Sequence, residues 1–192
     1  IPFRPKFIPQ EAVELKLAGE VTIRVRLVDC VGFMVEGAAG HLEDGAERLV
    51  KTPWYDHEIP FTQAAELGTR KVITDHSTIG VVVTTDGSFS DLPQEPYLDA
   101  ENQAISELKK LHKPFLVLVN SSHPSSRTAR EAAERIEKQH SVAAMPVNCA
   151  QLSEEDIRQI MEQILYEFPV SRVEFYMPKW VEMLPFSHPL KT

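Results

Sequence analysis

Two residues that follow a hydrophobic segment have the types and the spacing of a site for phosphate and metal. Asp29 closes the run Val21–Val28, and Gly32 follows three residues later. In nucleotide triphosphatases, an Asp at the end of a strand holds Mg²⁺, often through a water molecule, and the N–H of the Gly can meet a γ-phosphate. Glycine suits this place because it has no side chain to block a close approach. The motif is short, and an Asp in this position also commonly accepts turn hydrogen bonds, so both interpretations are open on the motif alone.

The segment before Asp29 has the pattern of a strand with one covered face, because apolar and polar residues alternate over Val21–Leu27. Ala12–Leu17 alternates more loosely, and residues 18–20 make a short turn, so the two segments predict an antiparallel hairpin. Ile1–Gln10 contains three prolines and is predicted to be an extended entry segment. Residues 37–45 are rich in glycine and are expected to form a mobile surface loop.

Strand and helix patterns alternate through the rest of the chain. The β-branched run Ile79–Thr84 fits a parallel strand covered on both faces. A second buried strand is predicted at Pro114–Asn120 and a third, shorter one at Ala143–Asn148. Helices are predicted at about 61–75, 97–111 and 125–140 and from Ser153 to a stop at Phe168, with a capping box at Thr128 and Glu131 and a cap at Ser153. The alternation predicts an α/β fold with a mainly parallel sheet that includes an antiparallel hairpin strand.

Ligands bind such sheets at the carboxyl ends of the strands, so the residues at these ends should share one edge. They are Asp29, Asp86, Asn120 and Cys149. This shared edge raises the functional interpretation of Asp29 above the interpretation as a turn residue.

Composition bounds the remaining classes of function. The formal net charge of −8 over 192 residues argues against nonspecific nucleic-acid binding and against a basic membrane patch. Cys30 and Cys149 stand far apart without a metal-binding companion, which favours a reducing cytoplasm. No apolar run reaches the ~18 residues of a membrane span. The chain lacks an initiator Met, so we expect it to be a fragment or a processed product.

The order of these elements resembles the translation-factor-related class of P-loop GTPases, and long stretches resemble the stage IV sporulation protein A family of spore coat morphogenesis ATPases. The stretches are 5–9, 26–32, 52–55, 59–61, 64–73, 76–87 and 165–170. The resemblance implies a P-loop NTPase-like three-layer sandwich over residues 1–168 and the start of a middle domain over residues 169–192. It also implies ATP and Mg²⁺ as cofactors and polymerisation with copies of the same protein. Other spore coat and membrane-anchoring proteins are the further partners it implies, at the forespore surface in the mother-cell cytoplasm.

By the same resemblance, Asp29 is expected to act as the Walker B carboxylate through Mg²⁺, and Gly32 to sense the γ-phosphate. Residues 33–45 and the following helix would be the moving switch. Asn120, Ser121 and Cys149 fall in the two loops that contact the base in such proteins. GTPases place an Asp at the position of His123, where it accepts two hydrogen bonds from guanine; without that carboxylate, selection of guanine should be lost. The sequence therefore favours adenine.

Two features depart from the family pattern. No G-x-x-x-x-G-K-S/T loop occurs in the chain; that loop supplies most phosphate contacts and a Mg²⁺-binding hydroxyl, and we expect it to precede residue 1. The family's switch threonines are replaced by residues 2–4, Pro-Phe-Arg. Either the upstream region lies outside this chain, or the chain is a degenerate relative.

The leading hypothesis is an ATPase whose hydrolysis drives self-assembly. A non-catalytic scaffold that keeps the fold for protein–protein contacts is the main alternative, and a true GTPase is the weaker one. This chain alone is predicted to fold, to bind ATP·Mg²⁺ weakly and to hydrolyse it negligibly.

Overall fold

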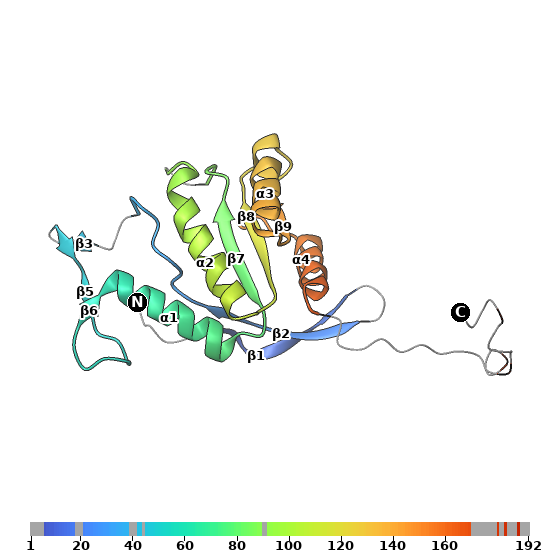
Figure 1. The fold of residues 1–192 in the computed structure, drawn as a ribbon, viewed down its shortest axis with the longest axis horizontal. Coiled ribbons are helices and arrows are strands. Elements are labelled where there is room, and N and C mark those ends of the chain that lie inside the picture. Colours follow the sequence, from blue (N-terminus) through green and yellow to red (C-terminus); the bar gives the residue numbers. More distant parts are fainter. Residues whose placement is uncertain are drawn as a thin grey trace.

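The computed structural model describes residues 6–17, 21–38, 42–43, 45–89 and 92–169, and the single residues 180, 183 and 188. The described chain has an α/β architecture in which a small parallel sheet is flanked by helices and a long antiparallel hairpin crosses beside it (Figure 1). The predicted strand at 173–177 lies outside the described residues, as does most of 180–184, so the domain boundary after residue 168 stays a prediction.

The parallel sheet has the strand order β7-β8-β9. Its strands are β7 (Gly80–Thr85), β8 (Phe115–Asn120) and β9 (Ala144–Val147), close to the three predicted segments. β8 lies in the middle, and five of its six residues are buried. Because adjacent side chains on a strand point to opposite faces, this strand supplies the core on both sides of the sheet.

Helices cover the two faces of the sheet and complete three layers. On one face, α2 (Leu98–Lys110) and α3 (Arg127–His140) pack against the sheet. The core there includes Val82, Val117, Val119, Ile105 and Ile136. On the other face lies α4 (Glu154–Tyr166), whose Ile160 and Ile164 pack against Leu116, Leu118 and Val147. The predicted α/β class is thus confirmed, and its layering is compatible with a P-loop-like fold.

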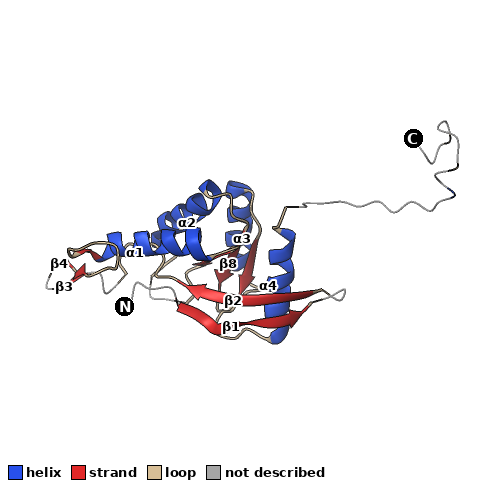
Figure 2. Cartoon of the chain, turned by 90° about the horizontal axis from the view of Figure 1, so that it is seen from below, coloured by secondary structure: helices blue, strands red, loops and turns tan. Residues whose placement is uncertain are grey.

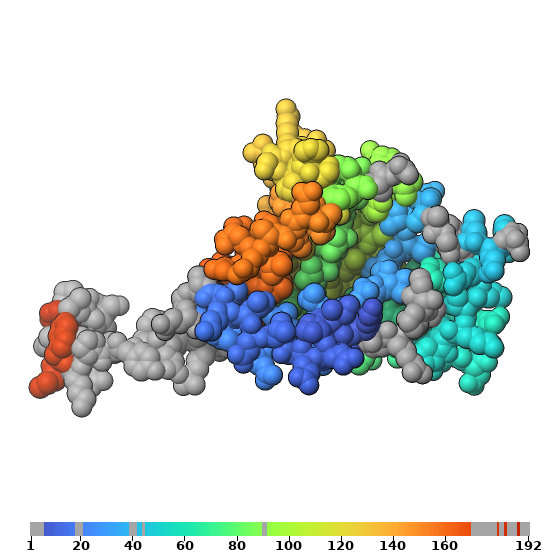
Figure 3. Space-filling view, turned by 180° about the vertical axis from the view of Figure 1, so that it is seen from behind, coloured from blue at the N-terminus to red at the C-terminus, as the bar shows by residue number. Residues whose placement is uncertain are grey.

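The first strand of the sheet corrects one prediction. We expected Ile79–Thr84 to be covered on both faces, yet the side chains of Val81 and Val83 are 41% and 58% exposed, while Val82 is buried. β7 pairs with β8 on one side, and no other described strand pairs with its free edge. Figure 3 shows green atoms of this part of the chain uncovered in a hollow between the hairpin and α4.

The predicted hairpin is confirmed, and it forms a sheet of its own. Strands β1 (Lys6–Lys16) and β2 (Thr22–Asp29) pair antiparallel, from Lys6 opposite Asp29 to Lys16 opposite Thr22 (Figure 2). β1 thus begins within the predicted entry segment, because its backbone pairs with the end of β2. The expectation that the hairpin strand belongs to the parallel sheet was wrong for the described residues, since β2 pairs with β1 alone.

The segment between β2 and β7 is built around α1 (Phe61–Lys71), which begins after Pro60 and continues into a π-helical turn, Val72–His76. Four two-residue strands precede it: β3 (Leu42–Glu43), β4 (Ala46–Glu47), β5 (Leu49–Val50) and β6 (Ile59–Pro60). β3 lies within residues 37–45, the region predicted to be a mobile loop, and it pairs with β4 just after that region. A 3₁₀ turn, Glu95–Tyr97, leads into α2. In the described part of the chain, no helix has the length and apolar character needed to cross a membrane.

The two predicted helix caps had different outcomes. Ser153 caps α4, and the Asp156 carboxylate accepts from the Ser153 N–H, which completes a capping box. The capping box predicted at Thr128 and Glu131 was wrong, because α3 begins earlier: the Ser126 hydroxyl oxygen accepts from the Ala129 N–H at 3.1 Å.

Candidate functional site

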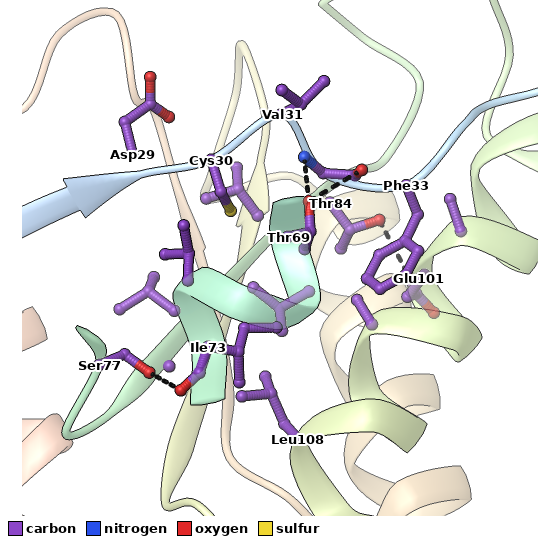
Figure 4. Close-up of a pocket in the computed structure, with 18 of the residues that line it drawn as sticks. Asp29, Cys30, Val31, Phe33, Thr69, Ile73, Ser77, Thr84, Glu101 and Leu108 are labelled. Carbon is purple, nitrogen blue, oxygen red and sulfur yellow. Dashed lines mark hydrogen bonds between the residues drawn. The ribbon is translucent and has the colours of Figure 1, made fainter. Parts of the chain in front are cut away.

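A cavity of about 480 Å³ runs along the free edge of β7. Its walls come from residues 28–33 at the end of β2 and just after it, the end of α1, β7 itself and one side of α2 (Figure 4). Asp29 and Gly32 both lie on its lining. Most of the lining is apolar, and no Lys or Arg is among the described residues that form it.

Asp29 is the last residue of β2 and is exposed. Its carboxylate makes no hydrogen bond or ion pair with any residue that the structure describes, and in Figure 4 it points away from the cavity floor. The strand end therefore presents a charged oxygen pair to solvent beside the cavity. Such a carboxylate can hold a water molecule of a hydrated Mg²⁺, and this role stays a prediction.

The Gly32 backbone is held by a hydroxyl of α1. The Gly32 N–H donates to Thr69 Oγ1 at 2.9 Å, and the same hydroxyl donates to the Gly32 carbonyl oxygen at 3.1 Å. Gly32 has φ +88°, a conformation that glycine adopts without the strain of a side chain. Thr69 is 3% exposed and lies 37 residues along the chain. Sequence reasoning missed it, since a Thr inside a helix carries no signal of a distant partner.

Cys30, which lies between Asp29 and Gly32 in the sequence, also faces the cavity. Its sulfur points into the cavity in Figure 4, although the residue as a whole is exposed. Burial raises the pKa of the Cys30 thiol, against smaller lowering effects of the Thr69 hydroxyl and the Gly32 backbone. The thiol is therefore held in its neutral form at neutral pH.

Two other predicted residues meet at the carboxyl edge of the parallel sheet. Asn120 is the last residue of β8, and Cys149 lies two residues after the end of β9. The Asn120 Oδ1 accepts from the Cys149 N–H at 2.9 Å. This bond ties together the two loops that were predicted to contact a base. Burial raises the pKa of the Cys149 thiol. The prediction that Asp29 shares this edge within one sheet was wrong, because β2 belongs to a separate sheet.

Ser121 is 1% exposed, and its hydroxyl is engaged inside the protein. It donates to Asp86 Oδ2 at 2.6 Å and accepts from the His123 N–H at 3.1 Å. The Ser88 hydroxyl donates to the other Asp86 oxygen at 2.5 Å and accepts from the Ser122 N–H at 2.9 Å. These bonds make Ser121 a residue that fixes the loop, and a direct contact from its hydroxyl to a base would have to replace one of them.

Asp86 is the centre of this network. Burial raises the pKa of its carboxyl, but the hydrogen bonds from Ser121 and Ser88 outweigh that effect and leave the pKa below its usual value. The sequence placed Asp86 at the sheet edge without a role. Its partner Ser121 lies 35 residues away, so the sequence offered no sign of the pair. His123 is exposed.

The residues that line the cavity fit a magnesium nucleotide in part. Asp29 offers a carboxylate, and Gly32 offers an N–H that is already bound to Thr69. The described residues contain no cluster of three His, Cys, Asp or Glu side chains that could hold a metal ion by themselves. A triphosphate here needs cationic groups from elsewhere, because phosphoryl transfer depends on neutralising its charge.

Comparison with known proteins decides the family. The sequence profile for the ATPase domain of stage IV sporulation protein A matches residues 2–169. The chain belongs to this family. Over 188 residues it is 46% identical to stage IV sporulation protein A of Clostridioides difficile (strain 630), an alignment that covers 98% of this chain and 38% of that protein. The resemblance stated from the sequence is confirmed.

Two further members of the stage IV sporulation protein A family give the same result. The proteins of Bacillus subtilis (strain 168) and Bacillus anthracis are 39% and 38% identical over 187 residues, with 97% of this chain and 38% of each relative covered. The chain therefore spans well under half the length of these relatives. No solved structure matches the chain.

Proposed function

We propose that this ATPase domain binds ATP·Mg²⁺ at the segment Asp29–Gly32 and that hydrolysis drives self-assembly of the protein that contains it. The observation that carries the proposal is the exposed Asp29 carboxylate, which bonds to none of the residues that the structure describes and lies at the rim of the cavity, three residues before Gly32. In this role Asp29 holds Mg²⁺ through a water molecule. ATP and Mg²⁺ supply the reactive phosphoanhydride and its charge neutralisation.

The missing phosphate contacts come, in this proposal, from a phosphate-binding loop that precedes Ile1. The strand leading into that loop would lie along the free edge of β7. Two features support this placement: the exposed apolar side chains of Val81 and Val83, and the cavity between this edge and the segment after β2. Unpaired backbone groups on a long apolar edge favour pairing with another strand.

For the base, we propose adenine. The exposed His123 stands where a GTPase carries the guanine-pairing Asp. The Ser121 hydroxyl is already hydrogen-bonded, as donor to Asp86 and as acceptor from the His123 N–H. Asn120 holds together the two loops proposed to contact the base, because its Oδ1 accepts from the Cys149 N–H. Base contacts in this arrangement come mainly from backbone groups.

Assembly at the forespore surface, in the mother-cell cytoplasm, is the wider role we propose. The partners are further copies of the same protein and other spore coat and membrane-anchoring proteins. The names of the relatives support a role in sporulation. A non-catalytic scaffold is the second candidate, favoured by the absence of Lys and Arg from the described lining of the cavity.

The test is single-turnover ATP cleavage by the full-length protein, in the parent and in an Asp29→Asn variant. Loss of a carboxylate that holds Mg²⁺ through water should slow cleavage about 10- to 100-fold, the range for groups one shell away from a metal. Asp56→Asn is the matched control, because Asp56 is also exposed but does not line the cavity. Equal cleavage by both variants would remove Asp29 from the site, and absence of cleavage in the parent would favour the scaffold.

A further inference from the structure

The Thr69–Gly32 pair closes a two-bond contact between α1 and the segment after β2. One hydroxyl accepts from the Gly32 N–H at 2.9 Å and donates to the Gly32 carbonyl oxygen at 3.1 Å, as the two dashed lines in Figure 4 show. Thr69 is almost fully buried, so water does not compete easily for these bonds. The Thr69 hydroxyl therefore satisfies both backbone groups of Gly32, as acceptor for its N–H and as donor to its carbonyl oxygen.

This contact occupies the backbone group that the proposed function assigns to the γ-phosphate. An N–H group makes one strong hydrogen bond, and sharing it between two acceptors weakens both. When a γ-phosphate approaches Gly32, its oxygen must displace Thr69 Oγ1 from the N–H. A nucleoside diphosphate carries no γ-phosphate and leaves the contact intact.

We propose that Thr69 is a specificity-determining residue of the nucleotide site: its hydroxyl competes with the γ-phosphate for the Gly32 N–H and lowers affinity for ATP without changing affinity for ADP. This inference rests on the proposed function. The competition also couples the nucleotide state to α1, because Thr69 sits in the last turn of that helix. Breaking the contact frees both the N–H and the carbonyl of Gly32 from the helix.

The segment beyond Gly32 keeps a second attachment to α1. Met34 packs against a cluster that includes Phe61 and Ala64 of the helix. Release of Thr69 therefore frees Gly32 locally, while Met34 continues to hold the following residues near the start of α1. The movement expected on ATP binding is a shift of the residues around Gly32, next to the cavity.

The test measures binding of a non-hydrolysable ATP analogue and of ADP, each with Mg²⁺, to the full-length protein by calorimetry. Thr69→Val removes the hydroxyl and keeps the shape of the side chain. It should raise affinity for the ATP analogue about three- to tenfold, the range of one net hydrogen bond, with ADP affinity unchanged. Thr69→Ser keeps the hydroxyl and should restore the parent ratio of the two affinities.

Hydrogen exchange at the Gly32 amide provides a second readout that does not depend on affinity. Without nucleotide, exchange should be faster in Thr69→Val than in the parent and in Thr69→Ser. Affinity for the ATP analogue that is unchanged or lower in Thr69→Val, or equal gains for both nucleotides, would overturn the role of Thr69. If the parent binds neither nucleotide, the proposed function fails and this inference fails with it; ATP binding that depends on Asp29 but ignores Thr69 rejects this inference alone.

Discussion

Replacing Arg135 tests how the structure holds α2 and α3 together beside the cavity. Glu101 of α2 has a side chain that is 1% exposed. Arg135 of α3 donates to its two carboxylate oxygens at 2.8 and 3.1 Å, and the Thr84 hydroxyl donates at 2.8 Å. Arg135→Met leaves the carboxylate buried without its cation, which typically costs about 3–5 kcal/mol. We expect about 3 kcal/mol, because the Arg135 side chain is 32% exposed and water reaches the site in the variant.

The assay is urea unfolding of the 192-residue chain, followed by circular dichroism. Arg127→Met is the matched control: its residue lies on the same helix, pairs with Glu131 at 2.7 Å and is 87% exposed, so the loss should stay below about 0.5 kcal/mol. A triple variant, Thr84→Val/Glu101→Met/Arg135→Met, removes every member of the network. It should lie within about 2 kcal/mol of the parent, since apolar replacement of a whole buried network is often tolerated.

The reasoning fails if Arg135→Met is no more destabilising than Arg127→Met. It also fails if the triple variant loses more stability than Arg135→Met alone. If the triple variant is the less stable of the two, the packing of the long side chains, rather than the burial of an unpaired charge, determines the loss of stability.

The other predictions concern the sheet edge, acid stability and the base. Val83→Lys should change the free energy of unfolding of this chain alone by less than about 0.5 kcal/mol, because Val83 is exposed. In the full-length protein, where the proposed strand beside β7 covers Val83, the same substitution should be strongly destabilising. Equal effects on the two proteins in urea unfolding would contradict that strand. Asp86 has a lowered pKa, so its contribution to stability is present at neutral pH and is lost as the pH falls below the usual carboxyl range near 4. Asp86→Asn should therefore flatten the decline in the free energy of unfolding measured between about pH 5 and 2. An unchanged slope in the variant would show that Asp86 does not cause the decline. The full-length protein should prefer ATP in competition binding, and a preference for GTP above about tenfold would refute the argument from His123.

The sequence predicted the parts of the fold that local patterns determine. The apolar run before Asn120 indicated a buried strand, and β8 is buried on both faces. The run Ile79–Thr84 has the same composition, yet β7 exposes Val81 and Val83. An apolar composition indicates that a strand can be buried. Whether it is buried depends on the strands and helices that pack against it, and these come from other parts of the chain. The cap of α3 was missed for a related reason: several hydroxyls stand near its start, and only the backbone shows that Ser126 is the one outside the first turn.

The sequence could predict which residues lie at the ends of strands. It could not predict the hydrogen bonds that these residues, or their neighbours, make with side chains far away in the chain. Asp29, Asn120 and Cys149 all lie at or just after the ends of strands. The bonds from Thr69 to Gly32 and from Ser121 to Asp86 join residues more than 30 positions apart. Such pairs depend on the packing of α1 and on the parallel register of β7 and β8, which a single sequence does not state.

Single-turnover ATP cleavage, measured side by side on this chain and on the full-length protein, tests the central claim most directly. The full-length protein should cleave ATP, its Asp29→Asn variant should be at least about tenfold slower, and the 192-residue chain should show negligible cleavage. Asp29 can hold Mg²⁺, but it does not replace a phosphate-binding Lys and a group of backbone N–H donors. Robust cleavage by the chain alone, lost in Asp29→Asn, would show that the phosphate contacts lie within Ile1–Thr192 and would contradict the account.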